Sequence, residues 1–246
     1  MTREEFYLTD DGIRLHAKLD RPEGPDKTPL CIVLHGLTGH MEEPHICAVS
    51  EAMNGLGIAT LRVELYGHGQ SDGEFRNHDL FKWISNVLTV DDYAKSLDFV
   101  TDLYLCGHSQ GGLATMLVAG MRPDSFQAIL PLSPALNISD GAKRGELRGV
   151  RFDPAHLPDM VSFHDLPLKG DYLRVAQLLD VDGAVRRYKG PVLLVHGTKD
   201  TTVPVQYSID AAAQYENAKL VLIDGDTHCY DYHLEQVLEA VKEFLS

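Results

Sequence analysis

The sequence predicts an α/β fold in which a mostly parallel, doubly wound sheet carries helices on both faces. Three observations predict it. From residue 29 onward, short apolar runs end in glycine or a polar turn, helical spacing of apolar residues follows each run, and two alternating segments precede the whole series. Strands that alternate with helices in this way pair in parallel through right-handed crossovers, so that helices cover both sides of the sheet.

The two alternating segments predict an antiparallel hairpin at the N-terminus. They span residues 5–8 and 13–19, and Asp10-Asp11-Gly12 separates them. An Asp-Gly pair suits a tight two-residue turn, so we expect the hairpin to form an antiparallel edge of the sheet.

The remaining core elements follow in order along the chain. Strands are expected at residues 30–34, 58–65, 103–106, 128–132, 192–195 and 220–223. Helices are expected at residues 44–56, 80–99, 111–121, 206–215 and 232–245.

Residues 137–183, here called the cap segment, interrupt this alternation. They are rich in glycine, proline and charge and separate two core strands. A connection of this length usually has structure of its own, often as a lid or binding element. We therefore expect an inserted cap on a core made of residues 1–136 and 184–246. Within the cap, residues 150–152 and 161–163 are expected to form a hairpin, and 172–179 a helix.

Composition excludes several classes of protein. The chain has 246 residues, of which 36 are acidic and 22 basic, and its net charge of −14 repels phosphate, with no Lys/Arg run to offset this. Nucleic acid is therefore excluded as an expected partner. A hydrophobic content of 44 % excludes disorder. The four cysteines lie far apart without CxxC spacing, which predicts reduced and mostly buried thiols.

The sequence shows no targeting or membrane segment. The N-terminal residues lack an apolar run behind a basic segment, and no apolar stretch reaches the roughly 18 to 20 residues of a membrane span. We expect a soluble, cytoplasmic protein with no membrane partner.

The strongest motif is Gly107-His108-Ser109-Gln110-Gly111. It follows the strand expected at 103–106 and precedes a helix of small residues. In this context GxSxG predicts a nucleophile elbow, a strained strand-to-helix turn that presents the serine hydroxyl above the sheet. Residues 69–73 match the same pattern around Ser71, but no strand leads into that turn, so Ser71 is interpreted as an ordinary loop serine.

A serine nucleophile needs a general base, and twelve histidines compete for this role. A histidine on a loop at the carboxyl end of a late strand fits best, and His228 follows the strand expected at 220–223. His196 ends its strand and is expected to be a hydrogen-bonded structural residue. His233 is expected on the last helix, and His108, next to the nucleophile on a sharp turn, in the wall of the site.

Besides the nucleophile and the base, a catalytic triad contains an acid that orients the base. Asp200 lies on the loop after the strand expected at 192–195, and this is the loop on which the acid of the triad is expected. Asp224, Asp226 and Asp231 are rivals, but they share a tight loop with His228 and cannot easily reach back to its inner ring nitrogen. They are interpreted as solvated turn residues.

Acyl transfer also requires donors for the oxyanion, usually two backbone N–H groups. The elbow supplies one from Gln110. The second is expected from Leu37, in the Gly-rich stretch His35-Gly36-Leu37-Thr38-Gly39 after the first parallel strand.

With these motifs, the chain resembles the α/β-hydrolase superfamily over essentially its whole length. The landmarks are His35-Gly36, residues 67–73, residues 107–111, His196-Gly197 with Asp200, and Asp226-Thr227-His228-Cys229. More narrowly it is similar to the bacterial cinnamoyl (feruloyl) esterases, through residues 35–39, Leu132-Ser133-Pro134-Ala135, Phe152-Asp153-Pro154, Pro158-Asp159, residues 172–177 and the position of the cap.

This resemblance implies a serine carboxylesterase that cleaves small aromatic hydroxycinnamate esters through an acyl-enzyme, with no metal or organic cofactor. It implies that the cap closes over the aromatic acyl group, that Asp140 accepts a hydrogen bond from a ring hydroxyl, and that a homodimer is possible. The stretch from Arg144 to Arg148 departs from the neutral polar contact of some members, which leaves the preferred ring substituents open.

Three alternatives stay open. A monoacylglycerol lipase or short-chain carboxylesterase would share every catalytic residue and differ in an apolar groove of the cap. A cofactor-free perhydrolase or C–C hydrolase would use the same triad on other substrates. A binding protein of the same fold would have lost catalysis, although the triad is complete in this sequence.

Overall fold

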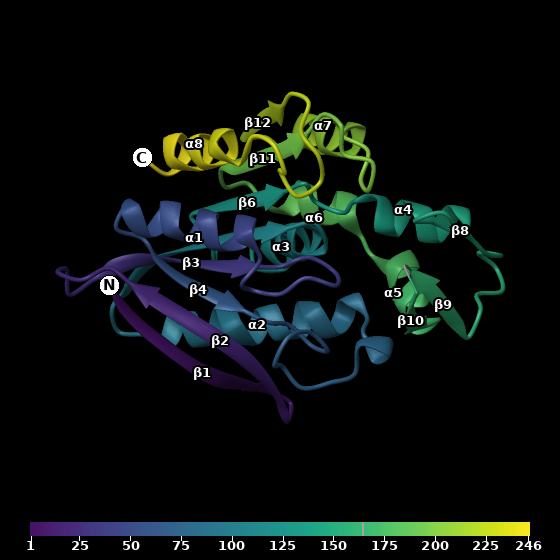
Figure 1. Cartoon of the computed structure of the whole chain (residues 1–246), viewed down its shortest axis with the longest axis horizontal. Helices are drawn as coiled ribbons and strands as arrows, with labels where there is room; N and C mark the ends of the chain where they lie inside the picture. Colours follow the sequence, from purple (N-terminus) through teal and green to yellow (C-terminus); the bar gives the residue numbers. More distant parts are fainter. Residues whose placement is uncertain (164) are drawn as a thin grey trace.

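The computed structural model describes residues 1–163 and 165–246. Its main sheet has eight strands in the order β1-β2-β4-β3-β5-β6-β11-β12 (Figure 1). These strands are β1 (Thr2–Asp10), β2 (Ile13–Arg21), β3 (Thr28–Leu34), β4 (Ala59–Val63), β5 (Val100–His108), β6 (Ala128–Leu132), β11 (Val192–Gly197) and β12 (Ala218–Ile223). Every neighbouring pair from β4 to β12 is parallel, which confirms the predicted α/β class.

The N-terminal hairpin is also confirmed. Strands β1 and β2 pair antiparallel with Asp10 opposite Ile13, and β2 in turn pairs antiparallel with β4. Asp11 and Gly12 close the turn with φ angles of 46° and 81°. A two-residue turn with two positive φ values matches the twist of the strands, which explains why the Asp-Gly pair directs a hairpin here.

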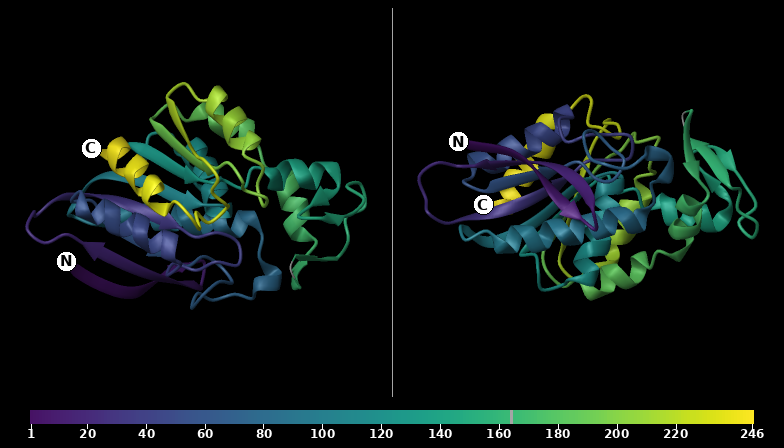
Figure 2. Two further views of the ribbon diagram at one scale, coloured as in Figure 1. Left: turned by 45° about the horizontal axis from the view of Figure 1, so that its top comes forward. Right: turned by 90° about the horizontal axis from the view of Figure 1, so that it is seen from below.

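Helices cover both faces of the sheet, because the residues of its central strands are buried on both faces. One face carries α1 (Pro44–Gly55) and α8 (Leu234–Leu245), and the other carries α2 (Leu80–Ser96), α3 (Gln110–Met121), α6 (Val181–Arg187) and α7 (Gln206–Gln214) (Figure 2). In β3 the side chain of Ile32 packs on the α2 and α3 side, while that of Val33 packs on the α1 and α8 side. A short 3-10 helix, Phe75–Asn77, precedes α2.

The cap segment contains two small sheets and two helices. Its elements are α4 (Asn137–Arg144), β7 (Glu146–Leu147), β8 (Val150–Arg151), β9 (Met160–Phe163), β10 (Leu166–Lys169) and α5 (Asp171–Leu178). They lie beyond the carboxyl ends of the parallel strands, to the right of the sheet in Figure 1. The helix expected at 172–179 corresponds to α5.

The predicted pairing of 150–152 with 161–163 is wrong. Strand β8 pairs with β7, and β9 pairs with β10, both antiparallel. Arg148 and Gly149, with φ angles of 51° and 79°, close a two-residue turn between β7 and β8. Pairing with the nearest neighbour in the chain closes a shorter loop and costs less conformational entropy than the predicted pairing.

The predicted end of the cap at residue 183 falls inside α6, which packs tightly on α3. A Cβ atom on Gly120 of α3 would lie 2.4 Å from Cα of Ala184. The predicted boundary therefore divides one helix, and the division into core and cap stays a prediction. None of the helices in the two described ranges is long and apolar enough to cross a membrane.

Candidate active site

Ser109 stands on a strained turn between β5 and α3. Its φ and ψ angles of 55° and −119° are rare for a residue with a side chain. The strand and helix approach so closely that a Cβ atom on Gly107 would lie 2.4 Å from the carbonyl oxygen of Gly111. A Cβ atom on Gly111 would lie 2.4 Å from the carbonyl oxygen of His35. The two glycines of the motif therefore allow the turn that presents the Ser109 hydroxyl.

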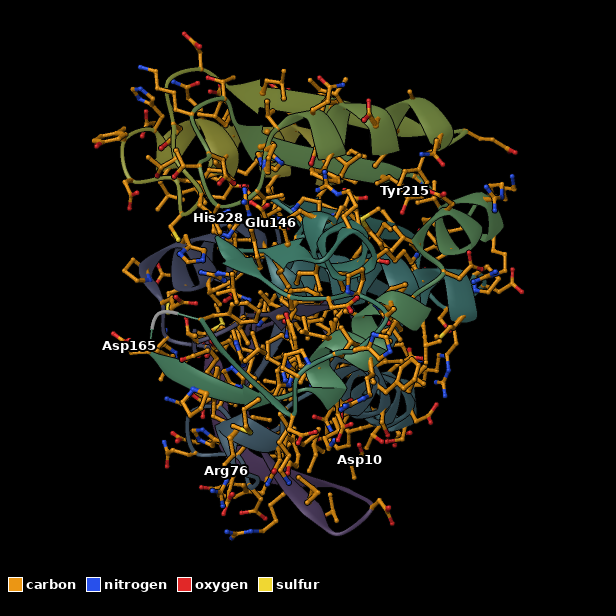
Figure 3. The ribbon with its side chains drawn as sticks, turned by 90° about the vertical axis from the view of Figure 1, so that its right-hand side faces the viewer. Asp10, Arg76, Glu146, Asp165, Tyr215 and His228 are labelled. Carbon is orange, nitrogen blue, oxygen red and sulfur yellow. The ribbon has the colours of Figure 1, made fainter. Side chains whose placement is uncertain are left out.

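The structure brings Ser109, His228 and Asp200 together. Nε2 of His228 lies 2.8 Å from Oγ of Ser109, and Nδ1 of His228 lies 2.6 Å from Oδ2 of Asp200. Asp200 lies on the loop after β11. His228 lies on the loop after β12 and is labelled in Figure 3. The carboxylate that accepts a hydrogen bond from Nδ1 keeps the imidazole proton on Nδ1. Nε2 is therefore unprotonated and can act as the base toward the serine hydroxyl.

Asp200 is held as a carboxylate. Its Oδ1 accepts hydrogen bonds from the backbone N–H groups of Thr202 and Val203, each at 2.8 Å, and its Oδ2 also accepts one from Nε2 of His196 at 3.0 Å. Burial alone would raise the pKa of Asp200, but the hydrogen bonds from His196 and His228 prevail and lower it below its ordinary value. The group therefore stays ionised when it faces the imidazole.

His196 is a structural partner of the acid. Its Nδ1 lies 2.7 Å from the hydroxyl of Ser208, and its Nε2 also lies 3.0 Å from the carbonyl oxygen of Val203. Because both neighbours of Nε2 are acceptors, that nitrogen carries the proton. The sequence placed His196 in a structural role, but no sequence signal showed that it would share the carboxylate with His228.

Two further side chains anchor the loop that carries His228. The hydroxyl of Tyr230 donates to the carbonyl oxygen of Val195 in β11 at 3.1 Å and accepts from Ser133 at 2.9 Å. Nε2 of His108 donates to the backbone carbonyl of His228 at 2.8 Å. His108 therefore positions the backbone of His228. His233, expected on the last helix, is the residue immediately before α8.

The rival acids have other partners. Asp226 is fully buried and accepts hydrogen bonds from the backbone N–H groups of Tyr232 and His233 at 3.2 and 2.9 Å, so its interpretation as a solvated residue is wrong. Asp224 accepts from the hydroxyl of Thr198 at 3.2 Å. The third rival, Asp231, accepts from the hydroxyl of Thr227.

Ser71 is a structural loop residue. Its hydroxyl donates to the backbone carbonyl of Glu64 at 2.6 Å and accepts from the backbone N–H of His16 at 2.8 Å. The Ser71 hydroxyl thus ties its loop to β2 and to the end of β4.

Leu37 and Gln110 both lie beside Ser109. Each of them lines a narrow cavity together with Ser109, and no described residue accepts a hydrogen bond from the backbone N–H of either. Two histidines hold the loop that carries Leu37: Nδ1 of His35 donates to the Gly36 carbonyl at 2.8 Å, and Nε2 of His68 accepts from the Thr38 N–H at 3.2 Å.

The side chain of Gln110 connects the core to the cap. Its Oε1 accepts a hydrogen bond from the hydroxyl of Tyr172 in α5 at 2.8 Å, and its Nε2 donates to Nε2 of His78 at 2.7 Å. All three side chains are buried. The contact to Tyr172 was not predicted, because no sequence pattern indicates which cap residue meets the elbow.

Two cavities meet at Ser109. The narrow one, of about 10 Å³, lies under the cap and is lined by Leu37, Ser109, Gln110, Ala135, Asn137, Ile138, Arg148, Tyr172, Thr202 and Val203. The wider one, of about 210 Å³, lies on the side of His228 and Cys229 and includes Glu43. Arg148 of the cap contributes to both cavities.

The predicted substrate contact of Asp140 is not supported by its position. Its carboxylate accepts a hydrogen bond from the hydroxyl of Tyr207 and forms an ion pair with Arg144 at 2.9 Å. It lines a separate cavity between α4, α6 and α7, and neither of the two cavities at Ser109. The helix α4, absent from the sequence prediction, turns this carboxylate toward α7. Across the described residues, no group of three or more His, Cys, Asp or Glu side chains could hold a metal ion.

Fold and site together define a serine hydrolase of the α/β-hydrolase class. The chain belongs to the α/β-hydrolase family described as "Serine aminopeptidase, S33", whose family model matches residues 25–158. A second model, described as "TAP-like protein", matches residues 172–246.

Among solved structures, Est1E from Butyrivibrio proteoclasticus with ferulic acid bound is similar to this chain with a TM-score of 0.96 and 56 % identity, covering 98 % of this chain and 97 % of that one. The mitochondrial palmitoyl-protein thioesterase ABHD10 of Homo sapiens is 26 % identical over 212 residues, or 79 % of this chain and 67 % of that protein. The lysophosphatidylserine lipase ABHD12 of Danio rerio is 28 % identical over 88 % of this chain and 58 % of that protein.

Proposed function

We propose that this chain is a serine esterase that hydrolyses hydroxycinnamate esters, such as feruloyl and cinnamoyl esters, through an acyl-enzyme intermediate. The observation that carries the reaction type is the 2.8 Å contact between Ser109 Oγ and His228 Nε2, with Asp200 on the other ring nitrogen. The observation that favours an aromatic acid is the likeness to Est1E, whose solved structure holds ferulic acid and which is 56 % identical over nearly the whole chain.

Acylation begins when Nε2 of His228 takes the proton of the Ser109 hydroxyl as its oxygen attacks the ester carbonyl. The carboxylate of Asp200 stabilises the imidazolium that forms. The backbone N–H groups of Leu37 and Gln110 donate to the oxyanion of the tetrahedral intermediate. When the intermediate collapses, Nε2 gives its proton to the leaving alcohol, and the acyl group stays on Ser109.

Deacylation repeats these steps with water. His228 removes a proton from the water molecule that attacks the acyl-enzyme, the same two N–H groups hold the second oxyanion, and the carboxylic acid leaves as Ser109 regains its proton. No step asks for a metal or organic cofactor, because proton transfer and oxyanion stabilisation come from these residues.

The cavity under the cap is the site we assign to the acyl group. Ile138 and Ala135 give it apolar walls, and Tyr172 and Arg148 add polar groups at the cap side. Its volume of about 10 Å³ is far smaller than a hydroxycinnamoyl group. Binding therefore requires this cavity to widen, and two of its lining residues, Arg148 and Tyr172, belong to the cap segment.

The proposal is tested by comparing kcat/KM for ethyl ferulate with kcat/KM for a medium-chain monoacylglycerol. We expect the ferulate to be the better substrate. A clear preference for the glyceride would overturn the aromatic assignment in favour of the lipase alternative. Cytoplasmic location and a homodimer stay predictions of the sequence.

A further inference from the structure

A chain of hydrogen bonds continues from the triad into the core, away from Ser109. Nε2 of His196 donates to Oδ2 of Asp200 at 3.0 Å, and the hydroxyl of Ser208 in α7 donates to Nδ1 of His196 at 2.7 Å. Oδ2 is the same oxygen that accepts from Nδ1 of His228 at 2.6 Å. One line of hydrogen bonds therefore runs from a helix on the face of the sheet to the nucleophile.

His196 and Ser208 are polar residues in an apolar environment. His196 is the only residue of β11 with a polar side chain, and both residues are fully buried. Burial of a polar group costs free energy unless it is hydrogen-bonded, and an apolar side chain of similar size avoids that cost. Among the described residues, the hydroxyl of Ser208 makes a hydrogen bond to His196 alone. The two side chains thus maintain a contact at Asp200 that the packing of the core does not require.

The two ring nitrogens of His196 have fixed roles. Nε2 faces two acceptors, Oδ2 of Asp200 and the carbonyl oxygen of Val203, each at 3.0 Å. The Ser208 hydroxyl donates to Nδ1 and so favours the tautomer whose proton is on Nε2. Because hydrogen bonds in a chain polarise one another, this donation also makes the Nε2–H group a stronger donor to the carboxylate.

The shared oxygen of Asp200 has two consequences for the base. The backbone N–H groups of Thr202 and Val203 hold Oδ1 while His196 holds Oδ2, so the carboxylate cannot turn away from His228. The donor on Oδ2 also takes up part of its negative charge, which weakens the attraction between the carboxylate and the imidazolium of His228. The same hydrogen bond helps to hold the pKa of Asp200 below its ordinary value.

We propose that His196 and Ser208 are positioning residues that set the orientation of Asp200 and, through it, how readily His228 takes up and releases a proton. Beside a shared carboxylate the imidazolium is stabilised less than beside an unshared one. His228 therefore acts as a free base at lower pH and returns its proton more easily to the leaving alcohol. This inference rests on the proposed function for the reaction type alone and not for the acyl group.

Other titratable groups also lie around the His228 ring, and they are the same in every variant below. Burial lowers the pKa of His45 to about 4 and that of His108 well below its ordinary value, so both are neutral at pH 7. Burial raises the pKa of Cys229 to about 11, so its thiol is uncharged. The groups, by element, are Glu43 and His45 at the start of α1, His108 at the end of β5, Arg148 of the cap, and Cys229, Tyr230 and Asp231 of the same loop.

The test compares His196→Met with His196→Gln, two variants of similar shape. The amide of glutamine can donate to Asp200 and to the Val203 carbonyl and can accept from Ser208, whereas methionine has no N–H group. The pH profile of kcat/KM is measured with phenyl acetate between about pH 4 and pH 9, and circular dichroism checks the fold at each pH.

In His196→Met we expect the midpoint of the acid limb to rise by about 0.5 to 1 pH unit and the plateau of kcat to fall roughly tenfold. The midpoint rises because the carboxylate now interacts with His228 alone, and kcat falls because Oδ2 is held less firmly. His196→Gln should rescue both, with a midpoint within about 0.2 pH unit of that of the unchanged protein.

Ser208→Ala tests the far end of the chain and decides the matter if His196→Met does not fold. Its midpoint should rise by about 0.2 to 0.5 pH unit, because Nε2–H of His196 becomes a weaker donor once Nδ1 has lost its partner. Ser50→Ala is the matched control. It removes an equally buried helical hydroxyl, which donates to the Ile46 carbonyl in α1 at 2.9 Å, and should leave the midpoint unchanged.

An unmoved midpoint in folded His196→Met or Ser208→Ala would overturn the role of that residue. Equal shifts in His196→Met and His196→Gln would overturn the proposal as a whole, because the hydrogen bond to Asp200 would then be irrelevant. If the unchanged protein hydrolyses no ester, the proposed function fails, and NMR of isotope-labelled histidine tests the inference without turnover. The His228 ring, identified by its absence in His228→Gln, should then take up its proton at higher pH in His196→Met than in the unchanged protein. The same pH in both would overturn the proposal.

Discussion

Asp200 Oδ2 lies 2.6 Å from Nδ1 of His228, although the two residues belong to different loops. Their loops follow β11 and β12, which run parallel with Gly197 opposite Ile223, so both leave the sheet at the same edge. The loops press together so closely that a Cβ atom on Gly197 would lie 2.4 Å from the carbonyl oxygen of Thr227. The distance between acid and base is therefore set by the backbone of adjacent strands.

Replacing Ser109 by alanine should abolish ester hydrolysis. Removing the attacking oxygen leaves only binding and the oxyanion donors, and we expect kcat to fall by roughly 10⁴-fold or more. The thermal unfolding midpoint should change little, because among the described residues the hydroxyl makes a hydrogen bond to His228 alone. Full activity in a folded Ser109→Ala protein would refute the assignment of the nucleophile.

Replacing Asp200 by asparagine should lower kcat by about 10²- to 10⁴-fold. The amide is neutral and stabilises neither the required tautomer nor the imidazolium of His228. Asp224→Asn is the matched control, because Asp224 is exposed on the His228 loop and its described hydrogen-bond partner is the hydroxyl of Thr198. Steady-state kinetics of the two variants decide the matter: equal losses would show that Asp200 does not orient the base.

Stability should fall as the pH drops from about 6.5 toward 4. Burial lowers the pKa of His45 to about 4 in the folded protein. Between that value and its unfolded value of about 6.5, the unfolded chain binds more protons, so stability is present above this window and is lost as the pH falls through it. At pH 5 the protonation of His45 in the unfolded chain lowers the free energy of unfolding by about 2 kcal/mol.

Urea unfolding at pH 7 and pH 5 measures this loss. His45→Gln replaces the imidazole by a neutral polar group that does not titrate, so the variant should lose less stability than the unchanged protein over the same interval. An identical loss in both proteins would contradict the role of His45.

Much of this fold could be predicted because its signals are local. The hairpin turn at Asp11-Gly12, the buried parallel strands and the elbow around Ser109 each depend on a few adjacent residues whose backbone conformation is restricted. The chain order of the motifs then placed Asp200 and His228 on neighbouring loops, where the structure brings them together.

The structure of the cap was harder to predict from the sequence, because its geometry depends on contacts between residues that are distant along the chain. The pairing of β8 was predicted wrongly, because a strand of two residues is too short for any periodicity to fix its partner. Asp140 was assigned to the substrate without knowledge of α4, whose orientation carries it to Tyr207 instead. Tyr172 was placed on a helix, but nothing in the sequence indicated that its hydroxyl reaches Gln110.

A glycine-to-alanine substitution at residue 107 should destabilise the fold. The added Cβ would lie 2.4 Å from the carbonyl oxygen of Gly111, so β5 and α3 must separate, at a cost of about 2 to 4 kcal/mol. Gly55→Ala is the control, because its Cβ would meet no atom within 4 Å at the end of α1. That change should be neutral or stabilise by about 0.5 kcal/mol. Comparable destabilisation of both variants in chemical denaturation would contradict the close-approach argument.

Replacing Tyr172 by phenylalanine tests the connection between cap and elbow. The variant keeps the buried ring but removes the hydroxyl that donates to Oε1 of Gln110, which leaves a buried acceptor unpaired at a cost of about 1 to 2 kcal/mol. Because Gln110 also supplies a proposed oxyanion donor, kcat should fall several-fold in addition to the loss of stability. Tyr104→Phe is the control, since the half-buried hydroxyl of Tyr104 in β5 has no hydrogen-bond partner among the described residues. An unchanged kcat in Tyr172→Phe, with stability reduced, would show that this contact only holds the cap in place.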